Sequence, residues 1–148
     1  MEYQGEITDF DRLVAELQQQ IDEQERALYS AKVIEEAHNP KNLGRMARPD
    51  AYGIVHGWCG DTMEVYLRLN GDRIKEATFT TDGCGPSVAC GSRLTTMVTG
   101  MSQDEANEIT PENLIAALDG LPEESLHCAE LAVSTLRYAL ERYLSGQP

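Results

Sequence analysis

Four cysteines, at positions 59, 84, 90 and 128, are the residues of this 148-residue chain with the widest range of chemistry. A thiolate binds soft or borderline metals and attacks sulfur, so the candidates are a metal centre or thiol chemistry. The four contain no Cys-x-x-Cys pair, the usual mark of a structural zinc site, so spacing alone is a weak signal. The local sequence around each cysteine is more informative.

Three of the cysteines lie where a reactive thiol is expected. Cys59 and Cys84 are placed in glycine-flanked loops, where burial adds little packing, so a functional thiol is favoured over a small buried hydrophobe. Cys128 lies in the first turn of a predicted helix, which fits either a ligand or a core residue. Cys90 continues a helical stripe with Leu94, so we expect it in the core.

Two further side chains could complete a metal site. His127 precedes Cys128, and Asp61 follows Cys59 by two residues; each could instead be a plain surface or turn residue. Three thiolates with one histidine or aspartate should hold an iron-sulfur cluster less firmly than four cysteines, which suits transfer. His38 and His56 lack such a context and are read as structural or exposed.

Strands in the middle of the chain would carry two of these loops. Residues 52–57 form a short candidate strand, and alternating apolar residues predict a hairpin from residues 63–69 and 76–79 with a turn at Asn70-Gly71. Cys59 would connect the first two strands, and Cys84 would follow the hairpin. One apolar face of this sheet must be covered.

The C-terminal half predicts helices that supply the cover. Pro86 begins one helix, Ser102 and Thr110 cap two more, and a last helix starts near Ser125. Strands followed by helices predict an α+β fold with the helices packed on one face of the sheet.

The N-terminal region predicts a separate amphipathic helix, with Thr8 or Asp9 as its cap and apolar residues from Phe10 to Leu28 at helical spacing. The favoured interpretation is a helix docked on its own domain; the alternative is an arm for self-association or for a partner, although it has barely three heptads. A second helix from Tyr29 should end at Asn39-Pro40. The predicted division is a helical extension over 1–28 and a domain over 29–148.

Charge and hydropathy exclude several classes of function. The net charge of -13 repels phosphate backbones and anionic lipid, which argues against nucleic acid and membrane partners. No apolar run is long enough for a membrane helix, and the first residues lack the pattern of a secretion signal. We therefore expect a cytoplasmic protein, in whose reducing surroundings metal or thiol chemistry is favoured over disulfides.

Five separate strings, in order and at similar intervals, resemble the IscU/NifU N-terminal family of iron-sulfur cluster assembly scaffolds. They are Tyr29-Ser30-Ala31-Lys32-Val33-Ile34, Asn39-Pro40-Lys41-Asn42-Leu43-Gly44, Cys59-Gly60-Asp61-Thr62-Met63, Thr81-Asp82-Gly83-Cys84-Gly85 and His127-Cys128-Ala129-Glu130-Leu131-Ala132. The resemblance implies a three-stranded antiparallel sheet packed against helices, in agreement with the pattern above.

The resemblance also implies a function. The protein would be a carrier, not an enzyme, that builds a transient 2Fe-2S cluster from iron and sulfur from a cysteine desulfurase, then passes it to acceptor proteins. By position, Cys59, Cys84 and Cys128 would be cluster ligands and persulfide acceptors, with Asp61 or His127 as the fourth ligand. Zinc could occupy the same site when no cluster is present.

Departures from the family pattern leave alternatives. Leu121-Pro122-Glu123-Glu124-Ser125 replaces a Leu-Pro-Pro-Val-Lys string read by an Hsp70 chaperone, which puts that partner in doubt. The SufU branch tends to have a different residue at the position of His127, so His127 argues against that branch. The competing functions are a zinc-bound sulfurtransferase that accepts persulfide from a desulfurase, and a structural zinc protein; a homo-oligomer is possible for each.

Overall fold

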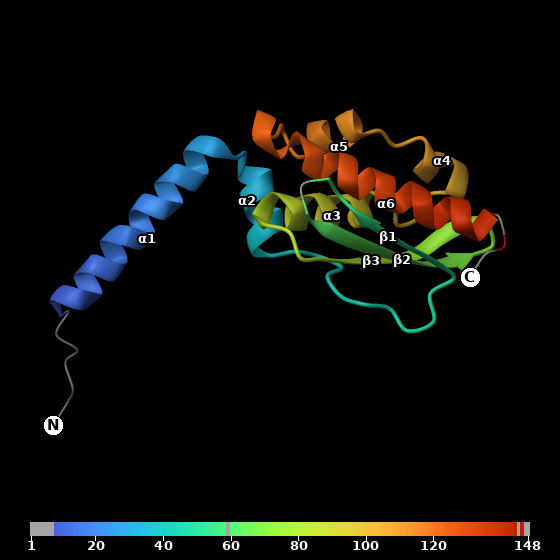
Figure 1. Ribbon diagram of the computed structural model, residues 1–148, viewed down its shortest axis with the longest axis horizontal. Coiled ribbons are helices and arrows are strands. Elements are labelled where there is room, and N and C mark those ends of the chain that lie inside the picture. The colour runs from blue at the N-terminus through green and yellow to red at the C-terminus, as the bar shows by residue number, and fades with distance from the viewer. Residues whose placement is uncertain (1–7, 59, 145, 147–148) are drawn as a thin grey trace, which may run out of the picture.

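The computed structural model describes residues 8–58, 60–144 and 146 (Figure 1). Cys59 therefore lies outside the described residues. Within the described part, the elements follow in the order α1 (Asp9–Leu28), α2 (Ala31–His38), β1 (Ala51–His56), β2 (Thr62–Asn70), β3 (Arg73–Thr81), α3 (Gly85–Val98), α4 (Gln103–Asn107), α5 (Pro111–Ala117), a 3-10 turn (Glu123–Ser125) and α6 (Leu126–Leu144).

The described strands form an antiparallel sheet in the order β1-β2-β3. Both the α+β class and the three-stranded antiparallel sheet are confirmed. The hairpin turn falls one residue later than expected, because Asn70 pairs with Arg73 and leaves Gly71 and Asp72 as the loop. Gly71 has a φ of 62°, a conformation that favours glycine, and a register shift between Arg68 and Leu69 accompanies the displaced turn.

The core lies between one face of the sheet and the helices α3 and α6, which Figure 1 shows above the strands. Alternate residues of the strands point into it, and Met63, Leu67 and Phe79 are fully buried. Two glycines allow the layers to approach: a Cβ at Gly53 of β1 would lie 2.8 Å from the Thr135 carbonyl oxygen of α6, and one at Gly91 of α3 would collide with the Phe79 ring.

Side-chain caps define the starts of several helices. Thr8, Ser102 and Thr110 each form a reciprocal capping box with the residue three positions later. The sequence predicts the box at Ser102, a cap at Thr110 and a cap at Thr8 or Asp9. Ser30 caps α2 and also donates to the Leu118 carbonyl oxygen at 2.5 Å, which ties α2 to the end of α5. These caps set where each helix begins.

Helix α1 does not dock on its own domain, so that expectation is wrong. None of its residues, all of which the structure describes, is buried. Figure 1 shows it projecting away from the body of the molecule. Its end is held by a hydrogen bond of 2.7 Å between Glu25 Oε1 and His38 Nε2 of α2, while its apolar residues remain exposed.

None of the helices in the described part of the chain has the length and apolar character needed to cross a lipid bilayer.

Candidate metal centre

The first turn of α6 supplies two of the candidate ligands. Cys128 is 1% exposed, and the neighbouring His127 is partly exposed, with its Nε2 atom 3.7 Å from Cys128 Sγ. Both residues therefore lie at the N-terminal end of α6, with the Cys128 side chain turned into the protein.

The turn between β1 and β2 supplies Asp61. The Gly57 amide donates to the Asp61 carbonyl oxygen at 2.7 Å, and the Gly60 amide donates to the Gly57 carbonyl oxygen at 3.0 Å. Gly60 has a φ of 95°, a conformation that a residue with a side chain rarely adopts. Cys59 comes two residues before Asp61 in the chain and is outside the described residues.

The structure brings together Asp61, His127 and Cys128, three of the residues named from the sequence. Their ligand atoms, one from each residue, lie within 4.8 Å of one another. A carboxylate oxygen, an imidazole nitrogen and a thiolate sulfur are all ligands that zinc accepts, and iron-sulfur clusters take sulfur and imidazole ligands. Asp61 lies 66 positions before His127 in the chain, so only the packing of α6 on the sheet makes it a neighbour of His127 and Cys128.

Ser87 is a site residue that the sequence reasoning missed. Its buried hydroxyl lies 3.3 Å from Asp61 Oδ2 and 3.4 Å from Cys128 Sγ, so it can donate a hydrogen bond to either ligand. A buried donor beside two ligands orients them and tunes their charge. The available signal was its place three residues after Cys84, in the first turn of α3.

Cys84 lies beside this group at the N-terminal cap of α3, where its thiol is exposed. Among the described residues it is not within the group formed by Asp61, His127 and Cys128. The backbone next to it does touch the group: a Cβ at Gly83 would lie 2.5 Å from Ser87 Oγ and 3.0 Å from Asp61 Oδ2. The glycine before Cys84 is thus needed for the approach of this loop to Asp61.

Cys90 is fully buried in the hydrophobic core. Burial raises the pKa of its thiol, and the nearby Cys128 and Cys84 raise that pKa further. A thiol held neutral in this way is a poor nucleophile and a poor ligand. The remaining histidines lie elsewhere: His38 pairs with Glu25, and His56 Nδ1 is 2.8 Å from Thr62 Oγ1.

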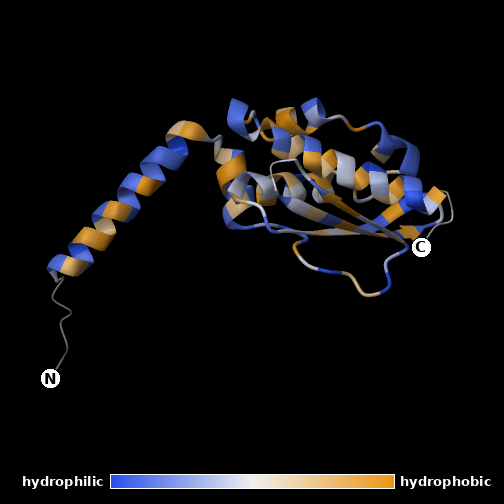
Figure 2. Cartoon of the chain, in the orientation of Figure 1, coloured by the Kyte–Doolittle hydropathy of each residue, from blue (hydrophilic) through white to orange (hydrophobic). Residues whose placement is uncertain are grey.

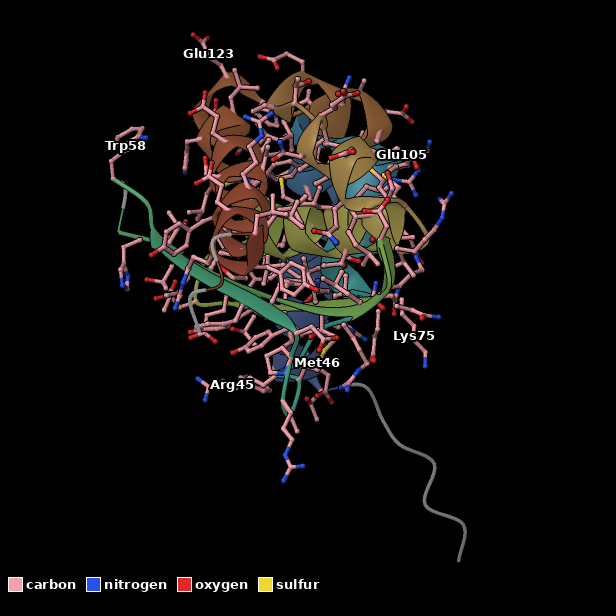
Figure 3. The ribbon with its side chains drawn as sticks, turned by 90° about the vertical axis from the view of Figure 1, so that its right-hand side faces the viewer. Arg45, Met46, Trp58, Lys75, Glu105 and Glu123 are labelled. Atoms are coloured by element: carbon pink, nitrogen blue, oxygen red, sulfur yellow. The ribbon has the colours of Figure 1, made fainter. Side chains whose placement is uncertain are left out.

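An exposed aromatic residue stands beside the group. Trp58 is 86% exposed, and its ring centroid is 5.7 Å from that of His127. Figure 3 shows its side chain directed away from the body of the molecule. A pocket of about 220 Å³ is lined by Trp58, by the end of β1 and by His127, Glu130 and Leu131 of α6.

Comparisons of sequence and of fold relate this chain to the same group of known proteins. The model of the NifU-like N terminal domain matches residues 28–147. The iron-sulfur cluster assembly scaffold protein IscU 1 of Archaeoglobus fulgidus is 38% identical over 117 residues, which are 78% of this chain and 76% of that protein. The IscU scaffold protein of Aquifex aeolicus is 34% identical over 122 residues, 80% of this chain and 78% of that protein.

Solved structures share the fold at lower identity. A NifU-like N-terminal protein from Brucella abortus superposes with a TM-score of 0.64 at 20% identity, covering 78% of this chain and 94% of that one. The matched family model spans the sheet, α2 to α6 and the residues of the candidate site, and it begins at the last residue of α1. The chain therefore belongs to the family of NifU-like N-terminal domains.

Proposed function

We propose that this protein is an iron-sulfur cluster assembly scaffold, a carrier and not a catalyst, with a transient 2Fe-2S cluster as its cargo. The proposed ligands are Cys59, Cys84 and Cys128, with Asp61 or His127 in the fourth position. The observation that carries the proposal is the group of Asp61, His127 and Cys128 ligand atoms within 4.8 Å. It occurs in a chain whose relatives are named iron-sulfur cluster assembly scaffold proteins.

The exposure of the ligands supports a transient cargo. Cys84 is exposed and lies in a loop, and Asp61 is a hard oxygen ligand beside soft sulfur. A site with one weak ligand and an open edge releases its cluster more readily than a closed site of four cysteines. The buried Ser87 hydroxyl can stabilise the Asp61 carboxylate when that oxygen is not a ligand.

Sulfur would arrive as a persulfide on a cysteine desulfurase. A scaffold thiolate attacks the terminal sulfur, the desulfurase thiolate leaves, and the scaffold cysteine then carries the persulfide. Cys128, Cys59 and Cys84 are the candidate acceptors. Cys84 is exposed whereas Cys128 is buried beside Asp61 and His127, so the two differ in access and in neighbouring ligands.

Partner proteins would bind the edge of the molecule that carries Trp58 and the candidate ligands. Trp58 offers a large exposed aromatic surface directly beside His127, and aromatic residues are the commonest anchors of protein interfaces. The partners that the function requires are the desulfurase and the proteins that accept the cluster. The net charge of -13 would steer encounters with partners of complementary charge.

Anaerobic reconstitution with ferrous iron and sulfide tests the proposal. We expect the visible absorption of a 2Fe-2S cluster, lost in Cys128→Ala and retained in Cys90→Ala, because Cys90 is a core residue. The far-ultraviolet circular dichroism of both variants checks folding. A colourless protein that retains only zinc would contradict the scaffold function.

Two alanine variants would assign the fourth ligand. Loss of the cluster in His127→Ala with retention in Asp61→Ala assigns the histidine, and the opposite result assigns the aspartate. His38→Ala is the matched control, because His38 pairs with Glu25 on α1.

The same ligand types also fit zinc, which keeps a zinc-bound persulfide-accepting sulfurtransferase as the second candidate. That function requires zinc-loaded protein to take labelled sulfur from a desulfurase without forming a cluster. Labelling that persists when Cys59, Cys84 and Cys128 are all replaced would contradict sulfur transfer in both forms.

A further inference from the structure

Helix α1 carries an uncovered apolar stripe, visible in Figure 2 as orange bands along the projecting helix. Its large apolar side chains are between 48% and 72% exposed, namely Phe10, Leu13, Val14, Leu17, Ile21 and Leu28. A stripe of this size on a monomeric protein would normally be covered. Its own domain does not cover it, because none of the described residues of α1 is buried.

The stripe follows the seven-residue repeat of a coiled coil, with Val14, Ile21 and Leu28 at the a positions and Phe10, Leu17 and Gln24 at the d positions. Branched residues such as Val14 and Ile21 at a, combined with Leu17 at d, favour two-stranded parallel coiled coils. The sequence of α1 is therefore suited to pair with an identical helix.

Charge is placed so that two copies can approach despite the net charge of -13. Most charged residues of α1 occupy the b, c and f positions, on the side away from the seam; they are Asp9, Arg12, Glu16, Asp22, Glu23 and Arg26. In a parallel pair, the flanking contacts from g to e would join Leu13 to Gln18 and Gln20 to Glu25 of the other copy. Neither contact opposes like charges.

An antiparallel pair would be less favourable in two ways. It would place Asp11 opposite Glu25 of the second copy, with like charges facing at both ends of the seam. It would also place Gln24 against Val14, leaving a polar amide against an apolar side chain. A parallel pair in register stacks Gln24 on Gln24, where the two amides can bond to each other.

We propose that α1 forms a parallel, in-register two-stranded coiled coil with α1 of a second copy of this chain. The pairing covers the exposed stripe and places two scaffold domains at the same end of the coiled coil. Because the helix has 20 residues, about three heptads, association should be weak and dependent on protein concentration.

Sedimentation equilibrium of the full chain over a range of concentrations tests the pairing. We expect a monomer-dimer equilibrium that Leu17→Glu weakens on the order of 100-fold or more, because two buried leucines are lost per dimer. Gln19→Glu is the matched control: it adds the same charge at the outer f position and should leave the dimer intact. Circular dichroism and cluster reconstitution should be unchanged in both, since Leu17 and Gln19 are exposed in the monomer.

Several outcomes would overturn the proposal. They are a monomer at every concentration, a dimer that survives Leu17→Glu, and a monomer whose α1 instead binds a different protein such as the desulfurase.

Cysteine cross-linking tests the orientation. Val14→Cys should form a disulfide-linked dimer under mild oxidation, because equal a positions face each other only in the parallel, in-register pair. Gln19→Cys, on the outer side, should cross-link no more than the unsubstituted chain, which measures the background from the native cysteines. A dimer without excess cross-linking of Val14→Cys would overturn the parallel arrangement.

Discussion

Helices α1 and α6 have nearly the same length, 20 and 19 residues, and both are amphipathic, yet they have opposite environments. Helix α6 buries residues along its length against β1 and α3, among them Cys128, Thr135 and Leu136. Helix α1 leaves its whole apolar stripe exposed. An apolar stripe thus shows that a helix needs a covering surface, but it does not show whether that surface belongs to the same chain.

The sharpest test of this contrast is the removal of the same side chain from each helix. Leu136 is fully buried, so Leu136→Ala should lower the free energy of unfolding by about 2–5 kcal/mol. Leu17 is 49% exposed, so Leu17→Ala should leave the unfolding of the domain almost unchanged at dilute concentration. Urea denaturation followed by circular dichroism measures both; equal losses would mean that α1 packs on the domain.

A second test concerns the close approach of α6 to the sheet. Gly53→Ala would bring a Cβ to within 2.8 Å of Ala139 N, so we expect a loss of about 1–3 kcal/mol and weaker metal binding, because a shift of α6 moves His127 and Cys128. Gly85→Ala is the matched control, since its Cβ would meet only the Ala37 Cβ at 3.8 Å. Thermal unfolding and metal titration would report both effects. Equal stability of the two variants would contradict the tight contact.

Alkaline pH should act on the sheet domain and not on α1. Burial and the hydrogen bond that Tyr66 donates to Glu64 raise the pKa of Tyr66 from 10.0 to about 12. The folded protein therefore keeps this phenol protonated where the unfolded chain releases the proton, so stability is present below pH 10 and is lost as the pH rises toward 12. The phenolate absorbance gives the pKa, and Tyr66→Phe should remove this part of the pH dependence of unfolding. A pKa near the usual value of 10.0 for Tyr66 would contradict this prediction.

The smallest expected effect is at the helix caps. Thr8→Ala removes the cap of α1 and should cost about 1 kcal/mol of local helix stability, seen as lower helicity without a change in the unfolding midpoint of the domain. Thr110→Ala removes a cap of the same type from α5, whose Leu114 is buried, and should lower that midpoint. An equal shift of the unfolding midpoint in Thr8→Ala and Thr110→Ala would contradict the difference between α1 and the rest of the protein.

Much of the fold could be predicted because its signals are local. The capping box at Ser102, the cap at Thr110, the alternation along β2 and the proline at the start of α3 each depend on residues a few positions apart. The hairpin turn was displaced by one residue because the register shift at Arg68 depends on how β2 pairs with β3. Register is a property of two strands together and cannot be read from one.

The candidate site likewise contains residues that the sequence predicted and one that it did not. Residue types and glycine-rich contexts were sufficient to name Asp61, His127 and Cys128 as ligand candidates, and the five family strings were sufficient to name the family. They could not indicate Ser87, an ordinary helix residue that becomes a neighbour of Asp61 and Cys128 only when α3, α6 and the β1–β2 turn converge.

The sequence by itself determined the order of helices and strands, the caps that begin several helices and the chemistry available, because these follow from short-range sterics, hydrogen bonding and side-chain type. Only the tertiary structure decided that α6 is covered and α1 is not, and that three ligand types lie within 4.8 Å. The physical reason is that burial and proximity depend on how elements distant in the chain pack together, which an amphipathic pattern leaves open.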